Sequence, residues 1–273
     1  LKNGKNLGVI RSINRALNES KCDFINWAAS DDKVLPNFVS LSAAVIEKNP
    51  RSVICMSELA VFTSENHEFH HRRDDAFVFD LTGCPSYLPP KDVADWHRSH
   101  ILWISGNTTF LRRELVLDMG GYMKSLEWHA DWFVGMVLAL RYGMCVVPEV
   151  LAALREKPGS YSQQGLTSFK QTVAVIQNIA TTLYLPEYND ILRIVKKYPC
   201  LLSPLSTQNI FIGLILAPRY WNLLINYLWW HLKYHAYLSR QNIWLFLLER
   251  SLAKIANTCI GGLKNMTVKA FNY

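Results

Sequence analysis

The chain has 273 residues, of which 50% are hydrophobic and 19% are charged. A chain of this length and composition can bury a substantial core, which excludes an intrinsically disordered protein. Its six cysteines are scattered singly, without a C-x-x-C pair, so we expect reduced thiols and no disulfide framework.

The net charge of +7 is concentrated near the C-terminus, where residues 200–273 hold seven lysines and arginines but one acid, Glu249. This region is also rich in tryptophan and tyrosine. Such a mixture favours an anionic membrane surface as a partner, and the lack of any nucleic-acid-binding motif argues against a nucleic acid. Pro204 and Arg219 interrupt the apolar stretch, so we expect it to lie on a membrane rather than span it. A helical subdomain with a basic, solvated face is the alternative.

The first predicted elements form a helix and then a strand that ends in two acids. Residues 8–18 place four apolar side chains on one helical face, and the apolar run Phe24–Ala29 predicts a buried strand. Asp31 and Asp32 follow this strand, and Pro36 suits the first turn of the next helix. We therefore expect the two acids at the carboxyl end of a strand, the edge where open α/β sheets bind ligands.

The middle of the chain predicts strands, a long loop and a helix. Residues 52–56 and 59–63 have β-type patterns, and the polar stretch from Ser64 to about Arg98 predicts a long functional loop or lid. Residues 101–104 predict another strand. Residues 112–119 predict a helix that leads into a glycine turn.

The later part of the chain is predicted to be mainly helical. An amphipathic helix is expected at Asp131–Tyr142, with Gly143 at the position where glycine commonly ends helices. Residues 145–147 and 150–154 predict short strands. From Gln164 onward the pattern is helical, with breaks at Pro186, Pro199, Pro204 and Pro218.

Several weak motifs, taken in this order, resemble glycosyltransferase family 2. They are Asn6-x-Gly8, Ser30-Asp31-Asp32, Leu35-Pro36-Asn37-Phe38, Gly106-Asn107-Thr108, Arg112-Arg113-Glu114, Gly120-Gly121-Tyr122, Asp131-Trp132 and Gly143. The resemblance covers residues 3–165 and implies an α/β GT-A fold, a Rossmann-like mixed sheet flanked by helices. It further implies that residues 1–165 are a GT-A core lacking its N-terminal nucleotide-binding strands. Residues 166–273 would then form a helical C-terminal extension.

On the donor side, the resemblance implies a nucleotide-diphosphate sugar and a Mg²⁺ or Mn²⁺ ion. Asp32 would coordinate the ion and Asp31 would assist through the metal or the ribose, because a cation held by carboxylates neutralises the leaving diphosphate. Many relatives have an acid where this chain has Ala29. Arg155 and Lys157 resemble the segment that closes over the diphosphate. The alternative for Asp31 and Asp32 is that they only cap the next helix. The alternative for Arg155 and Lys157 is a basic loop exposed to solvent.

On the acceptor side, the resemblance makes Asp131 the catalytic base, although relatives have an acid where this chain has Ala130. As the first-turn residue of a helix, Asp131 is expected to stay ionised without a raised pKa, and a plain helix cap is its alternative role. Acceptor-binding roles are expected for five residues near it: Gly106, Asn107, Trp128, His129 and Trp132. Stacking on a sugar face is the role expected of the tryptophans, and core packing is the alternative for Trp132 and His129.

Together these expectations describe an inverting, metal-dependent glycosyltransferase that adds a single sugar to a saccharide or lipid-linked acceptor in cell-envelope polysaccharide synthesis. The chain has no Gln-x-x-Arg-Trp motif, which argues against a processive synthase. We expect a cytoplasmic protein that is peripheral on the inner face of the cell membrane. The alternative is an inactive relic or scaffold, since a fold does not fix a function.

A zinc-protease motif, H-E-x-x-H, is also present, at His67-Glu68-Phe69-His70-His71. In a zinc protease this motif lies on a helix, which places both histidines on one face. The flanking residues are polar and offer no apolar stripe that would bury such a helix, so the sequence argues against a zinc hydrolase.

Overall fold

The computed structural model describes residues 2–63, 70–71, 73–74, 77–78, 81–99, 102, 104–157 and 159–238. The chain divides into two compact units at residue 226, and the second unit begins at Tyr227. The first unit contains all the strands of the described residues. The second is described only through the end of the last helix, α10, at Leu238.

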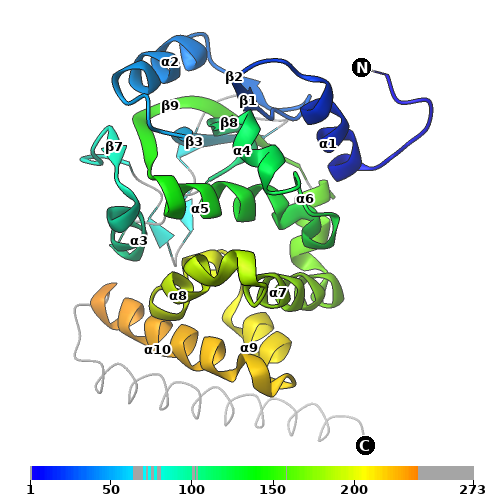
Figure 1. The fold of residues 1–273 in the computed structure, drawn as a ribbon, viewed down its shortest axis with the longest axis vertical. Coiled ribbons are helices and arrows are strands. Elements are labelled where there is room, and N and C mark those ends of the chain that lie inside the picture. The colour runs from blue at the N-terminus through cyan, green and yellow to red at the C-terminus, as the bar shows by residue number, and fades with distance from the viewer. Residues whose placement is uncertain are drawn as a thin grey trace, which may run out of the picture. The chain divides into compact units, whose positions relative to one another are not determined.

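A mixed β-sheet forms the centre of the first unit (Figure 1). Its strands run in the order β1 (Phe24–Asn26), β8 (Thr109–Arg112), β3 (Ile54–Thr63), β9 (Met144–Glu156) and β2 (Lys33–Val34). Short strands β4 (His70–His71) and β7 (Tyr87–Leu88) pair with β3 and β9, and β5 (Arg73–Asp74) pairs with β6 (Phe77–Val78) in a separate ribbon. Among the described strands, only β3 and β9 pair in parallel, so the expected α/β class with a mixed sheet is confirmed.

The parallel pair β3 and β9 is the most deeply buried part of the sheet. Nine of the ten residues of β3 are buried, as central strands covered on both faces require. The sequence predicted two strands for each of these segments, whereas each is continuous. Ser57 and Glu58 pair with Val147 and Val150, so Pro148 and Glu149 bulge outward and are exposed. This bulge accounts for the apparent break.

Helices cover both sides of the sheet, with α2 and α5 on opposite sides (Figure 1). The α-helices are α1 (Val9–Glu19), α2 (Phe38–Lys48), α3 (Pro90–Ser99), α4 (Arg113–Asp118), α5 (Ala130–Tyr142), α6 (Tyr161–Thr167), α7 (Phe169–Leu183), α8 (Asn189–Lys197), α9 (Thr207–Ile215) and α10 (Trp221–Leu238). Five 3-10 turns connect them: η1 (Gly106–Thr108), η2 (Lys124–His129), η3 (Pro186–Tyr188), η4 (Cys200–Leu202) and η5 (Pro218–Tyr220). Phe38 of α2 is buried in a cluster with Cys55, Cys145, Val147 and Leu151.

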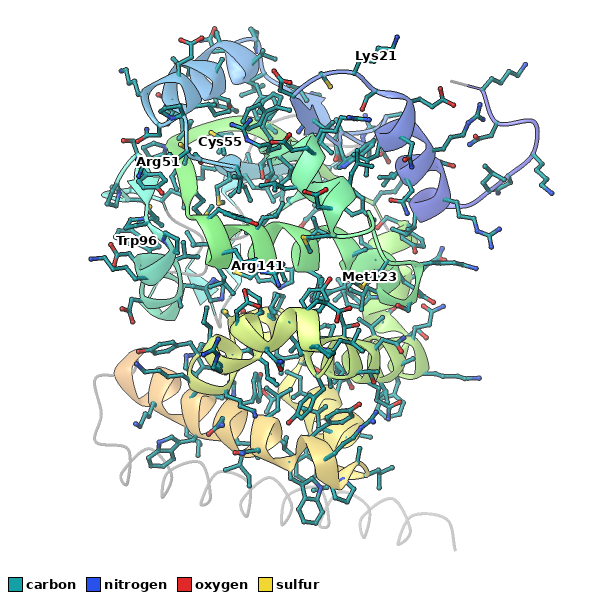
Figure 2. The ribbon with its side chains drawn as sticks, viewed as in Figure 1. Lys21, Arg51, Cys55, Trp96, Met123 and Arg141 are labelled. Carbon is teal, nitrogen blue, oxygen red and sulfur yellow. The ribbon has the colours of Figure 1, made fainter. Side chains whose placement is uncertain are left out.

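Helices α7 and α8 pack onto the sheet-bearing part of the first unit through η2 and α5. Arg141 at the end of α5 forms a two-pronged pair with Asp190 of α8, with nitrogen–oxygen distances of 2.8 and 3.1 Å. Its side chain is labelled in Figure 2. Helix α7 contacts both η2 and α9. The division at residue 165 between a GT-A core and a helical region stays a prediction.

The structure corrects four expectations about the elements. Strand β1 stops at Asn26, and Ala28 and Ala29 are exposed rather than buried. Leu102 and Ile104 lie in no strand, and the strand of this region is β8 instead. The predicted loop from Ser64 to Arg98 contains most of α3. Helix α5 is buried on all sides from Trp132 to Leu140 rather than amphipathic, because the sheet and other helices surround it.

In the described part of the chain, no helix is long and apolar enough to cross a membrane. Five cysteines there are free, as expected, and four of them are buried. The basic C-terminal region falls largely on residues 239–273, which lie outside the described residues.

Candidate functional site

The acidic turn lies between β1 and β2, and contacts with distant segments fix it. The Asp32 amide donates a hydrogen bond to the Ala29 carbonyl over 3.1 Å, which closes the turn. The Asp32 carboxylate accepts from the Arg155 backbone amide over 3.0 Å and from the Asn107 side-chain amide over 3.2 Å. Asp31 is exposed. The structure thus brings together Asp32, Arg155 and Asn107, which the resemblance had assigned to different parts of the site.

The environment of Asp32 opposes its ionisation. Burial of the carboxyl group is the main cause that raises its pKa, and the neighbouring charge of Asp31 raises it further. The hydrogen bonds from Arg155 and Asn107 act in the opposite direction and lower the pKa, but the net pKa is above the ordinary value. A carboxylate in this situation gains more than an exposed one from a nearby cation, since the cation relieves both unfavourable effects.

The turn η1 carries Gly106 and Asn107 and is held rigidly from β1. The Asn26 side-chain amide donates to the carbonyls of Gly106 and Thr109, over 2.9 and 3.0 Å. The hydroxyl of Ser105 donates to the Asn107 side-chain carbonyl over 2.8 Å, which orients the Asn107 amide toward Asp32. Asn107 is only 3% exposed. No local pattern indicated the role of Asn26, because that role depends on contacts with residues about 80 positions away.

Asp131 lies in the first turn of α5, beside the same turn η1. Its carboxylate accepts from the Trp132 amide over 2.8 Å and contacts the Gly106 amide. A Cβ added at Gly106 would lie 3.5 Å from Asp131 Oδ2, an ordinary contact, and a tight 3.2 Å from the Trp27 carbonyl, so Gly106 lies close to both groups. Burial raises the pKa of Asp131 although these hydrogen bonds lower it. The expectation of a pKa that is not raised was therefore wrong, because desolvation outweighs the helix N-terminus.

A second hydrogen-bond network lies next to Asp131 and involves Asn14, Tyr122 and Trp27. The side-chain amide of Asn14 binds both backbone groups of Tyr122 over 2.8 Å, fixing the turn after Gly120 and Gly121. The Tyr122 hydroxyl accepts from the indole nitrogen of Trp27 over 2.6 Å. Burial raises the pKa of Tyr122, and the nearby Asp131 charge adds to the effect. None of these three side chains had been predicted as part of the site.

Three of the five residues expected to bind the acceptor are buried: Asn107, as described above, and His129 and Trp132. His129 is 3% exposed and its ring nitrogen lies 3.5 Å from the Leu201 carbonyl. Trp132 is 4% exposed and its indole nitrogen donates to the same carbonyl over 3.2 Å. Both side chains therefore pack in the core and do not fit the direct acceptor contacts expected of them. The packing alternative holds for these two residues.

Trp128 remains partly exposed, next to a residue with unusual backbone geometry. Glu127 has φ 45° and ψ −126°, and within the described ranges no other residue except glycine has a positive φ. Such backbone strain is concentrated at functional sites. Gly165 of α6 lies directly against the Trp128 ring, because a Cβ there would come within 1.9 Å of the indole.

The structure offers two carboxylates for a metal, Asp31 and Asp32. Among the residues with described positions, no group of three or more His, Cys, Asp or Glu side chains could hold an ion. Two carboxylates fit Mg²⁺, which proteins often bind through one or two carboxylates together with substrate phosphates. Ala29, three residues before Asp32, is exposed and has no side-chain oxygen that could bind a metal.

The described part of the H-E-x-x-H motif does not form the helix that a zinc protease requires. His70 and His71 form strand β4, which pairs with Ala60 and Val61 of β3. A strand cannot supply the helical spacing that this motif requires. His67 and Glu68 lie outside the described residues.

Comparisons with known proteins show what the chain is similar to. Among curated proteins none matches the chain. Solved structures that resemble it include S. aureus TarS residues 1–349 in complex with UDP-GlcNAc, with 15% identity, TM-score 0.48, and coverage of 81% of this chain and 60% of that one. Another is the mannosyltransferase PcManGT from Pyrobaculum calidifontis in complex with GDP-Man and Mn²⁺, with 13% identity, TM-score 0.42, and coverage of 93% and 61%. This chain thus spans about 60% of the length of both structures. The family model described as Glycosyl transferase family 2 matches residues 1–119, so this part of the chain is similar to that family.

Proposed function

We propose that this protein is an inverting, metal-dependent glycosyltransferase that moves one sugar from a nucleotide-diphosphate sugar to a saccharide or lipid-linked acceptor. The observation that carries the proposal is the turn η1. Its consecutive residues Gly106 and Asn107 contact the carboxylates of Asp131 and Asp32 respectively. One short segment therefore sets the position of a proton acceptor relative to that of a cation-binding carboxylate.

On the donor side, the residues would bind and orient the sugar diphosphate. Asp31 and Asp32 would hold Mg²⁺ or Mn²⁺, and the ion when bound supplies positive charge that stabilises the leaving diphosphate. The raised pKa of Asp32 favours this role, because a bound cation restores the stability of the ionised form. Arg155 and Lys157 would add positive charge around the phosphates.

On the acceptor side, Asp131 would act as the general base. Its carboxylate takes the proton of the acceptor hydroxyl while the acceptor oxygen forms a bond to the anomeric carbon from the face opposite the diphosphate. The bond between that carbon and the diphosphate oxygen breaks, and its electron pair leaves with the diphosphate. A pKa raised by burial makes Asp131 a stronger base than an exposed aspartate.

The deciding experiment is a transfer assay with the purified chain, Mn²⁺ and a panel of nucleotide sugars. The variant Asp131→Asn keeps the shape of the side chain and removes the base, so we expect the rate to fall by about 100-fold or more. Asp32→Ala should abolish metal-dependent turnover, and EDTA should do the same to the unaltered chain. The exposed Asp118 of α4 provides the matched control as Asp118→Asn. Wild-type rates in Asp131→Asn or Asp32→Ala would refute the corresponding role.

The same assay addresses the alternative of an inactive relic or scaffold. If the unaltered chain transfers no sugar from any donor but binds saccharide, the scaffold reading replaces the enzyme. The described residues favour catalysis, since two acids with raised pKa values lie beside one turn, and perturbed carboxyl groups gather at functional sites.

We further propose that the acceptor is presented at an anionic membrane surface, in cell-envelope polysaccharide synthesis, on the cytoplasmic side. The support is a set of exposed apolar side chains around α9 and the start of α10, near the exposed Arg219. They are Leu216 at 81%, Ile225 at 62%, Trp221 at 47% and Phe211 at 44% exposure. Co-sedimentation with vesicles containing anionic lipid tests the idea. Binding that persists in a Leu216→Ser, Ile225→Ser variant would contradict this surface as the contact.

A further inference from the structure

Two cationic side chains beside the acidic turn lie over one aromatic ring, that of Phe62. The Lys33 ammonium nitrogen is 4.5 Å from the ring centroid, and the central carbon of the Arg155 guanidinium is 5.3 Å from it. Phe62 is fully buried. Cations in such positions are attracted to the ring by its quadrupole, which partly offsets the repulsion between them.

The strand register explains why these side chains converge. Arg155 pairs with Phe62 between the parallel strands β9 and β3. Lys33 pairs with Ala153 between β2 and β9. Ala153 and Arg155 are two residues apart on β9, so their side chains lie on the same face of the sheet. The positions of the two cations are thus set by the sheet and not by a flexible loop.

The Arg155 side chain has an unsatisfied donor. Its Nε atom is buried, and no hydrogen-bond partner for it exists in the described part of the chain. Its backbone amide, by contrast, donates to Asp32. A buried guanidinium donor without an acceptor is costly, so its presence beside the acidic turn points to an anionic ligand that supplies the acceptor.

We propose that Lys33 and Arg155 form one receptor for the diphosphate of the donor, and that Phe62 is the positioning residue that holds both cations in place. This inference rests on the proposed function and makes it more specific. It assigns a binding role to Lys33, which no sequence motif had indicated. In this proposal the main phosphate contacts come from Lys33 and Arg155 on the sheet and not from the exposed Lys157.

Direct binding of nucleoside diphosphates and monophosphates tests the pair, for example by calorimetry with UDP, GDP, UMP and GMP in the presence of Mn²⁺. Lys33→Met keeps most of the stem and removes the charge. We expect its dissociation constant for the diphosphate to rise about tenfold, as for one lost charged hydrogen bond. Lys33→Arg should restore binding. The exposed Lys21, labelled in Figure 2, gives the matched control as Lys21→Met.

The comparison of diphosphate with monophosphate separates phosphate recognition from general damage to the fold. Loss of Lys33 should reduce the preference for diphosphate, whereas a structural defect would weaken both ligands alike. Equal affinities of Lys33→Met and the unaltered chain for the diphosphate would overturn the inference while leaving the proposed function intact. If the unaltered chain binds no nucleoside diphosphate and transfers no sugar, the proposed function fails and the inference fails with it.

For Phe62, the variant Phe62→Leu keeps an apolar side chain in the core but removes the ring. Its folding is checked first by thermal unfolding. A rise in the dissociation constant for the diphosphate, with the monophosphate less affected, is the expected result. Unchanged selectivity in a folded Phe62→Leu protein would remove the positioning role.

Discussion

Two buried histidines should make the protein unstable in mild acid. The ring of His97 accepts from the Leu102 amide over 3.2 Å through Nδ1, and its Nε2 lies 2.7 Å from the Ser203 hydroxyl. That geometry uses the neutral ring, with Nε2 as the donor. Burial lowers the pKa of His97 to about 3, and it lowers the pKa of His129 to about 4.

The sign and size follow from proton linkage. Both pKa values in the folded state lie below the ordinary value of 6.5, so the unfolded chain binds more protons as the pH falls. The stability that these histidines contribute is therefore complete above about pH 6.5 and is lost as the pH falls toward their folded-state values. Between pH 7 and pH 5, each histidine should lower the free energy of unfolding by about 2 kcal/mol, and the pair by about 4 kcal/mol.

Urea unfolding followed by tryptophan fluorescence at pH 7, 6 and 5 measures this loss. His97→Gln and His129→Gln each remove one titrating ring. Each variant should therefore lose about 2 kcal/mol less free energy of unfolding between pH 7 and pH 5 than the unaltered chain, regardless of its stability at pH 7. Asp32 and Asp131 have raised pKa values, so their contribution to stability changes with pH in the opposite direction. This contribution is the same in the variants and in the unaltered chain, so it cancels when the two are compared. An unchanged slope in both variants would refute the reasoning.

Three further substitutions test the packing and the turn. Gly165→Ala places a methyl group within 1.9 Å of Trp128, so thermal unfolding should show a loss of about 1 to 3 kcal/mol, whereas Gly4→Ala, with open space around it, should show none. Asn26→Leu leaves the carbonyls of turn η1 without their donor, and kcat/KM in the transfer assay should fall by about 100-fold if the turn shifts by about 1 Å. Tyr122→Phe removes a hydrogen-bond acceptor and should lower the free energy of unfolding by about 1 kcal/mol in urea.

Local sequence signals predicted the helices and the acidic turn well. Gly143 ends α5 as expected, with a positive φ of 78°. Phe38, Leu41 and Val45, at helical spacing, do face the core from α2. The position of a helix and the place where it ends depend mainly on residues a few positions apart, which is the range that a sequence pattern covers. The bulge of β9 was missed for the same reason, because a local pattern cannot distinguish a strand with two bulged residues from two strands.

The assembly of the site could not be predicted in this way. Asp32 is joined to Asn107 across 75 positions and to Arg155 across 123 positions. These contacts depend on strand order and register, which no local pattern specifies. The raised pKa of Asp131 was missed similarly. The sequence shows its place at a helix start, but not the burial of its carboxyl beside Gly106 and Tyr122.

The two acids of the site are coupled mechanically because one turn serves both. Asn26 anchors η1 to β1, and η1 in turn contacts Asp131 through Gly106 and Asp32 through Asn107. Any shift of this turn must therefore move a contact of each carboxylate at the same time. Such a shift would disturb the proposed metal binding and the proposed proton transfer together, whereas substitution of either acid alone would disturb one of them. A defect in Asn26→Leu that affects both functions, with both carboxylates intact, is the behaviour that this arrangement requires.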